Sequence, residues 1–243
     1  MWSRFAVHDI KLRFKRSIIG PFWLTLSMGV MVGVLGLISS SIFQQNMAGV
    51  LPYIAVGLIF WGFLTSCINE GADVFIGSAR YIRNIPMQLS IHLYRMIAKN
   101  IIILGFNMMI YLLILVIFPQ PLNLNYLLVL PGFALYLINV AWAAFVVAVL
   151  SARYRDIPHV ISNLVQVIFF LTPVFWSAAK LPNRPAFVTW NPVYHMLEIV
   201  RSPLLGERPS IVSWSVSAIC ALAGCACVLL LYRRAYPRIS YWV

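Results

Sequence analysis

Long uncharged stretches alternate with short basic ones along this chain. Residues 17–69, 100–152, 157–179 and 209–232 contain no Asp, Glu, Lys or Arg. A helix needs roughly 20 apolar residues to cross about 30 Å of hydrocarbon. Each of the two longer stretches therefore predicts two crossings, and each of the two shorter ones predicts one.

Residues that end helices interrupt both long stretches. The first is broken at Gln44-Gln45-Asn46, with Gly49 and Pro52 close behind, and the second at residues 119–125, which hold two prolines and two asparagines. In lipid, only a helix or a closed β-barrel lets every backbone N–H and C=O group form a hydrogen bond, and runs of this length are typical of helices. We therefore predict an all-α integral membrane protein, one transmembrane domain over residues 1–243. Its six transmembrane helices are expected at about residues 21–43, 51–68, 101–118, 126–150, 159–177 and 211–232.

The composition agrees with the bilayer as solvent. Hydrophobic residues make up 62% of the chain and charged residues only 10%, against about 25% charged in soluble domains. The basic lead 1–16 is too long for a signal peptide and no small-residue cleavage site follows, so we expect it to be retained. All four cysteines fall in or beside predicted spans, where they act as small apolar residues.

Basic residues are unevenly divided between the two sides of this topology. Fourteen of the 18 Lys and Arg residues fall in the N-terminal lead, in loops 69–99 and 151–158, and in the C-terminal tail. The other four fall in residues 178–210. The basic side of a membrane protein faces the cytoplasm, so we expect both termini there. Topology and anionic headgroups explain the net charge of +12 better than nucleic-acid binding does.

We find no motif for catalysis or for energy coupling. Ion-driven transporters place ionisable groups inside their spans, and the predicted spans lack Asp, Glu, Lys and Arg. Phosphate-binding loops, zinc motifs and nucleophile elbows do not occur. We expect no catalytic residue, metal or cofactor in this chain, so uphill transport needs energy from another subunit. A symmetric dimer is the economical way for six-helix chains to enclose a path.

The N-terminal stretch is partly amphipathic. At 100° per residue, one arc carries Ala6, Val7, Ile10 and Phe14. Basic side chains gather on another arc, which predicts an interface helix in the headgroup plane within residues 1–20. A disordered basic lead that only sets topology is the alternative. The predicted interface residues are Phe5, Ile10, Lys11, Arg13, Phe14, Lys15 and Arg16.

Two cytoplasmic segments carry clustered cations. The first predicts a short helix that ends at a proline, in the run Arg80-Tyr81-Ile82-Arg83-Asn84-Ile85-Pro86. Such a helix suits the transfer of force from a soluble partner. A solvated connector is the alternative. The run Arg153-Tyr154-Arg155-Asp156 precedes Pro158, which fits the first position of the next helix, with Asp156 near its positive end. A further role open to these arginines is to bind phosphate groups on a substrate.

The outer segment 178–210 has helical periodicity after Trp190-Asn191-Pro192. One face carries Val193, Leu197, Val200 and Leu204. The other carries His195, Glu198 and Arg201, with Glu198 placed to pair with Arg201. The pattern predicts a short outer helix, either re-entrant or lying against lipid at the interface.

Aromatic residues make up 14% of the chain. Most Trp and Tyr near span ends are interface anchors. Aromatic faces stack on sugar rings, so deep aromatics are candidates for lining a glycan path; packing and lipid contact are the alternative. The deep aromatic residues are Trp61, Tyr111, Trp142, Phe169 and Phe170.

These segments together resemble the permease subunit of type 2 ABC exporters, specifically the polysaccharide-export group that includes the O-antigen permease Wzm and the capsule permease KpsM. The resemblance covers nearly the whole chain. It rests on the runs Arg13–Trp23, Arg153–Ile157, Thr172–Trp176, Trp190–His195 and Glu198–Gly206. One departure is Leu89-Ser90-Ile91-His92, where the family often has a second proline after its coupling helix.

The resemblance implies a homodimer bound to two copies of a separate ATPase, which would bind ATP and Mg²⁺. It would export a lipid-linked glycan, with O-antigen on a polyprenyl diphosphate as the expected cargo, across the bacterial inner membrane. It also implies a coupling helix around Arg80–Pro86, substrate entry near Arg153–Asp156, and outer gate helices. The implied channel and gate residues are Trp61, Tyr111, Trp142, Phe169, Phe170, Trp176, Trp190, Tyr194, His195, Glu198 and Arg201.

Other functions remain open from the sequence. Within the same superfamily, a teichoic-acid, capsule or small-molecule exporter has the same pattern, and neighbouring glycosyltransferase genes would distinguish them. A membrane-embedded lipid enzyme would need convergent ionisable groups, for which His195 with Glu198 is the one candidate pair. A purely structural subunit would leave the ATPase activity of its assembly unchanged when removed.

Overall fold

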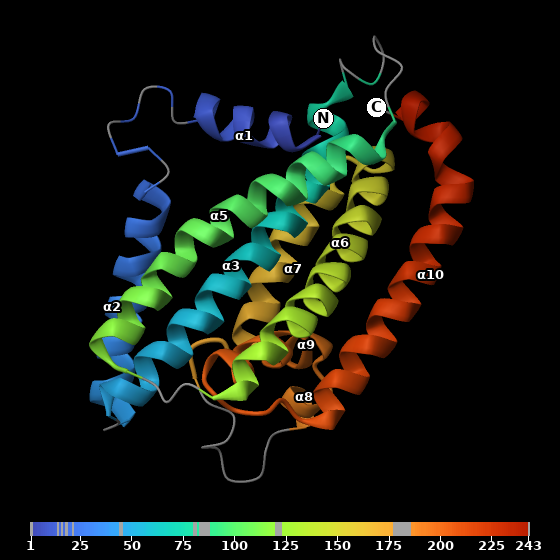
Figure 1. The fold of residues 1–243 in the computed structure, drawn as a ribbon. Coiled ribbons are helices and arrows are strands. Elements are labelled where there is room, and N and C mark those ends of the chain that lie inside the picture. Colours follow the sequence, from blue (N-terminus) through green and yellow to red (C-terminus); the bar gives the residue numbers. More distant parts are fainter. Residues whose placement is uncertain are drawn as a thin grey trace.

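Five helices in the described part of the chain are long and apolar enough to cross a membrane (Figure 1). The computed structural model describes residues 2–13, 15, 17, 19–20, 22–43, 46–79, 82, 88–119, 123–176 and 186–242. All the secondary structure in these residues is helical. The elements are α1 (Trp2–Arg13), α2 (Phe22–Phe43), α3 (Met47–Gly77), α5 (Ser90–Ile117), the 3-10 helix η1 (Leu124–Leu128), α6 (Val129–Arg153), α7 (Ile157–Leu171), α8 (Ala186–Thr189), α9 (Pro192–Leu204) and α10 (Ile211–Trp242).

The break after the first span lies where the sequence predicts it, but the next helix begins earlier than residue 51. Asn46 caps α3, and its side-chain oxygen accepts a hydrogen bond from the Ala48 amide at 3.0 Å. Gly49 and Pro52 therefore lie inside the helix. Pro52 lies in the second turn, where its missing N–H removes one backbone hydrogen bond.

The helices on either side of loop 69–99 extend far into it. The structure continues α3 to Gly77 and begins α5 at Ser90. One pair of charged side chains in these extensions joins the two helices, with Lys99 Nζ 2.8 Å from Glu70 Oε2. The predicted span ends at residues 68 and 101 lie at the edges of the uncharged stretches. A helix can continue past such an edge, so the charge pattern locates the apolar region and not the end of the helix.

The helix expected at 159–177 is shorter than a full crossing. Its observed counterpart, α7, has 15 residues and ends at Leu171, so it rises about 22 Å. Thr172 adopts an extended backbone (ψ 131°) because the following Pro173 disfavours helical geometry at the residue before it. Pro158 is the second residue of α7 and not the first, one position later than predicted.

Helix α3 occupies the centre of the bundle, against α2, α5, α6, α7 and α9 (Figure 1). Helix α10 packs on α6 and α9, while α1 packs on α5. Both chain ends lie at one end of the bundle, and α8 and α9 lie at the other. A chain whose two ends lie on the same side of a membrane crosses it an even number of times, and this arrangement agrees with that.

The apolar arc predicted for α1 is divided between two environments. Ala6 and Ile10 are buried against the bundle, whereas Val7 is 44% exposed. Ala6 and Ile10 are four residues apart and share one face of the helix, and α1 packs against α5. Phe14 and Arg16 lie outside the described residues.

Candidate functional site

The outer helix α9 is packed on both faces. The face predicted to be apolar is covered, but so are His195 and Arg201, which are 5% and 1% exposed. Neighbours on every side explain this, because α3, α6, α10 and η1 all contact α9. A lipid-facing interfacial helix is therefore excluded, and α9 is part of the protein core at this end of the bundle.

Arg201 joins three separate elements at the centre of this region. Its Nη1 donates to the Pro173 carbonyl at 2.7 Å, and its guanidinium lies 4.0 Å from the centre of the Tyr53 ring. Its other nitrogens donate to Glu198, as the sequence predicts, and Ser202 donates to the second oxygen of that carboxylate at 2.9 Å. Every buried charge here has a partner.

The charge state of Arg201 follows from these contacts. Burial is the largest single influence and lowers the pKa of the guanidinium, but Glu198, Tyr53 and Tyr194 together raise that pKa by more. The pKa therefore ends above its usual value. Arg201 is therefore a cation, and it is hydrogen-bonded to Glu198.

The irregular segment after α7 is held by hydrogen bonds from both sides. The Tyr53 hydroxyl donates to the carbonyls of Pro173 (3.3 Å) and Trp176 (3.2 Å). Asn191 caps α9 by accepting from the Val193 amide at 2.9 Å, and it donates to the Thr172 hydroxyl at 2.8 Å. The start of α9 and the end of α7 are thus fixed to each other.

Two glycines allow this close packing. A Cβ atom on Gly57 of α3 would collide with the Val174 carbonyl, and one on Gly132 of α6 would collide with the Ile199 carbonyl. The backbone at Val174 therefore lies directly against α3, and the backbone at Ile199 lies directly against α6. The sequence offers no signal for these positions, because the spans contain other glycines with open space around them.

His195 and Glu198 do not pair with each other. The His195 ring nitrogens contact the Ser213 hydroxyl at 3.0 Å and the Thr189 carbonyl at 2.9 Å. Glu198 is engaged with Arg201 and Ser202. The one candidate pair for a lipid enzyme is therefore absent, and among the described residues no group of His, Cys, Asp or Glu is suited to a metal.

Three of the five deep aromatics come together. Trp61 of α3 and Phe169 of α7 have ring centres 5.5 Å apart, and Phe170 lies 5.4 Å from Phe169. All three line a groove of about 360 Å³ between α2, α3 and α7, which we call the α3–α7 groove. The structure groups them because α7 crosses α3 at this level.

The other two deep aromatics have structural contacts elsewhere. The Tyr111 hydroxyl donates to the Leu204 carbonyl at the end of α9, and Trp142 Nε1 donates to Asn139 at 3.0 Å. Neither lines the α3–α7 groove. Of the outer aromatics, Trp190 is 82% exposed, while Trp176 and Tyr194 are half-buried.

At the opposite end, α1 docks through an ion pair that the sequence analysis missed. Asp9 accepts both donors of the Arg95 fork, and the Arg95 guanidinium lies 5.5 Å from the centre of the Phe5 ring. Beside it is a polar cavity of about 330 Å³ that includes Glu70 and Lys99. Asp9 and Arg95 are 86 residues apart, so no local sequence pattern indicates that they pair.

The predicted entry segment contacts the end of α10. The Arg153 guanidinium lies 5.6 Å from the centre of the Trp242 ring, and Arg155 is 3.5 Å from the Trp242 carbonyl. Tyr154 lies beside Arg153, and Asp156 precedes α7 without a side-chain capping bond. Arg80, Tyr81, Arg83, Asn84, Ile85 and Pro86 lie outside the described residues, as do the side chains of Lys11 and Arg13; Ile82 packs against the core and Lys15 is exposed.

Comparison with known proteins extends these observations. Residues 6–205 match the ABC-2 type transporter family. The chain is 19% identical over 192 residues to the O-antigen export system permease protein RfbA of Myxococcus xanthus, covering 78% of this chain and 74% of that protein. A protein of the same name from Klebsiella pneumoniae is 19% identical over 195 residues, again with 78% and 74% covered.

Proposed function

Because this chain belongs to the ABC-2 type transporter family, we propose that it moves a lipid-linked polysaccharide, O-antigen on a polyprenyl diphosphate carrier, across the inner membrane of a bacterium. The coarser statements come from the family: the chain is a multi-pass membrane permease, non-catalytic, without a cofactor of its own and partnered with an ATPase subunit. The export of a glycan is the proposal.

Two observations support the choice of cargo. The relatives that cover about three quarters of the chain are O-antigen export permeases, and Trp61, Phe169 and Phe170 line the same α3–α7 groove. Aromatic rings stack on the C–H faces of sugars in the way they stack on other flat, weakly polar surfaces. A glycan can slide along such a surface without a deep energy minimum.

The assembly we propose is a homodimer with two ATPase subunits. The α3–α7 groove is open along α2 and α7, whose outward faces are apolar, with Val30, Leu37, Leu164 and Val167 each about half exposed. One chain does not enclose a path. A second copy related by a two-fold axis would close the groove with the same surfaces.

We also propose that α7 and the buried segment 172–176 together make the sixth crossing. Thr172 and Val174 are fully buried although their backbone is irregular. Irregular backbone at membrane depth is tolerated where protein covers it. The termini and the segment 80–86 would then face the cytoplasm, where segment 80–86 would receive the force of ATP hydrolysis.

Deletion of the gene in the native host tests the cargo. We expect surface polysaccharide to disappear and carrier-linked polysaccharide to accumulate inside the cell, because synthesis continues without export. The restored, tagged protein should bring a nucleotide-hydrolysing subunit with it on purification. Unchanged surface polysaccharide, with no such subunit recovered, would overturn the proposal.

A further inference from the structure

The α3–α7 groove has a polar side as well as an aromatic one. Thr65 and Asn69 of α3 and Ser162 and Gln166 of α7 all line it. Each pair is spaced four residues apart, which places its members on one face of its helix. On α3 the row continues from Trp61 through Thr65 to Asn69, so the aromatic and polar parts share one stripe.

Two polar atoms on this stripe are buried without partners. Thr65 Oγ1 and Asn69 Oδ1 are shielded from solvent and have no hydrogen-bond partner among the described residues. Buried polar groups in folded proteins are nearly always bonded. No described residue bonds these two atoms, and the groove that both side chains line is where a ligand from outside would meet them.

The chemistry of the groove selects the kind of partner. Among the described residues that line it, none is charged, so nothing there favours a diphosphate. Hydroxyl, amide and aromatic groups are all present within one groove. A sugar unit matches this set, because it has hydroxyls on its edges and C–H groups on its faces.

We propose that Thr65, Asn69 and Gln166 form the hydrogen-bonding side of a subsite for neutral sugar units of the exported glycan. This inference rests on the proposed function and deepens it. The aromatic rings hold the faces of a sugar, and the polar row exchanges hydrogen bonds with its hydroxyls as the chain advances. The stripe along α3 spans two turns, which suits a path more than a single closed pocket.

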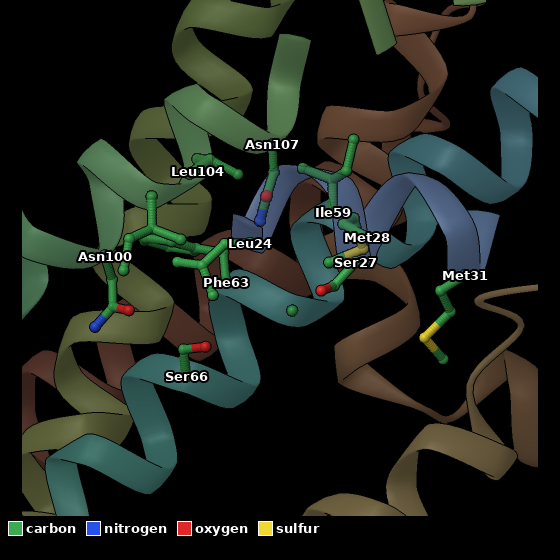
Figure 2. A pocket seen from close by; sticks show the side chains of 12 residues that line it. Leu24, Ser27, Met28, Met31, Ile59, Phe63, Ser66, Asn100, Leu104 and Asn107 are labelled. Carbon is green, nitrogen blue, oxygen red and sulfur yellow. The ribbon is translucent and has the colours of Figure 1, made fainter. Parts of the chain in front are cut away.

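A neighbouring cavity supplies a matched control. Figure 2 shows this cavity of about 260 Å³ on the α2, α3 and α5 side, where Asn107 lies with Leu24, Met28, Ile59 and Leu104. Asn107 Oδ1 is also buried without a partner in the described residues. Asn107 differs from Asn69 in lying away from the Trp61 cluster.

The test compares near-isosteric apolar variants in the native host, co-expressed with the ATPase subunit. We expect the triple variant Thr65→Val, Asn69→Leu, Gln166→Met to lower the rate of surface polysaccharide appearance about tenfold, while the amount of assembled complex stays normal. Asn107→Leu should export like the unmodified protein.

Each outcome separates the inference from the proposed function. If the unmodified protein exports no polysaccharide, the proposed function fails. If it does and the triple variant exports equally well, the polar subsite is wrong. If the triple variant does not assemble, the single change Gln166→Met decides, because Gln166 is exposed in the groove and its loss does not disturb packing; a normal export rate there overturns the inference.

Discussion

The buried Arg201 guanidinium donates to the Pro173 carbonyl across 28 residues of sequence, at 2.7 Å. The hydrogen bond links the outer helix α9 to the segment where α7 ends. Tyr53 of α3 touches both groups, since its ring lies under the cation and its hydroxyl donates to the same carbonyl. Movement of α9 away from α7 would break both contacts of Arg201, while the Tyr53 hydrogen bond still holds the segment after α7 to α3.

Removal of the Arg201 charge should destabilise this end of the protein. Arg201→Met leaves the Glu198 carboxylate without its partner, and breaking one side of a buried pair costs about 3–5 kcal/mol. We expect a lower thermal unfolding midpoint for the purified complex in detergent. Adding Glu198→Gln to Arg201→Met should recover part of the loss.

A matched arginine is available for comparison. Arg208 is exposed and donates to Asn125 at 3.2 Å. Arg208→Met should change the unfolding midpoint little, because exposed polar contacts contribute at most about 1 kcal/mol. If Arg201→Met and Arg208→Met lowered the unfolding midpoint equally, the stabilising role of the Arg201 contacts would be contradicted.

Added methyl groups at the two contact glycines should displace the outer segment. Gly57→Ala and Gly132→Ala each force a backbone carbonyl to move, and overpacking of this kind costs about 1–3 kcal/mol. Gly105 of α5 has open space around its Cα, so Gly105→Ala should be neutral or stabilising by about 0.5–1 kcal/mol. Unfolding midpoints of the three variants measure the difference.

The docking of α1 should depend on one ion pair. Asp9→Asn removes the charge that meets Arg95, and we expect faster backbone amide exchange across α1 with little change in the spans. The exchanged pair Asp9→Arg with Arg95→Asp should restore part of the protection. His8→Ala, an exposed neighbour, serves as control; equal exchange in all variants would show that α1 is held by Ala6 and Ile10 alone.

The proposed coupling segment can be tested although it lies outside the described residues. Arg83→Glu should leave the protein inserted and its complex assembled, while ATP hydrolysis continues without export. The reason is that a reversed charge disturbs the contact through which the ATPase would push on this chain. Polysaccharide export and ATPase activity are measured side by side; normal export in this variant would count against the assignment, and Arg208→Glu at the opposite end is the control.

The sequence predicted the membrane-embedded, all-helical architecture because the bilayer imposes a local requirement. A crossing must be apolar over a fixed length, and that property is visible in any window of the chain. The break at Asn46 and the pairing of Glu198 with Arg201 are also local, since each involves residues within a few positions of one another. The predicted span 159–177 ran past the observed end of α7 at Leu171, although Pro173 is a local signal for that end. Helix ends at Gly77 and Ser90 were not predicted, because a helix continues past the last apolar residue when its charges find partners.

What covers a face was decided by the tertiary structure alone. A helical pattern shows that His195 and Arg201 differ from Leu197 and Val200, but it does not show that α3, α6 and α10 enclose both sets. Tyr53 and Arg201, or Asp9 and Arg95, meet only after the spans have packed, and no spacing along the chain records those meetings. The sequence thus predicts the spans and their sidedness from local composition, while the groove and the outer cluster form only because distant segments pack together.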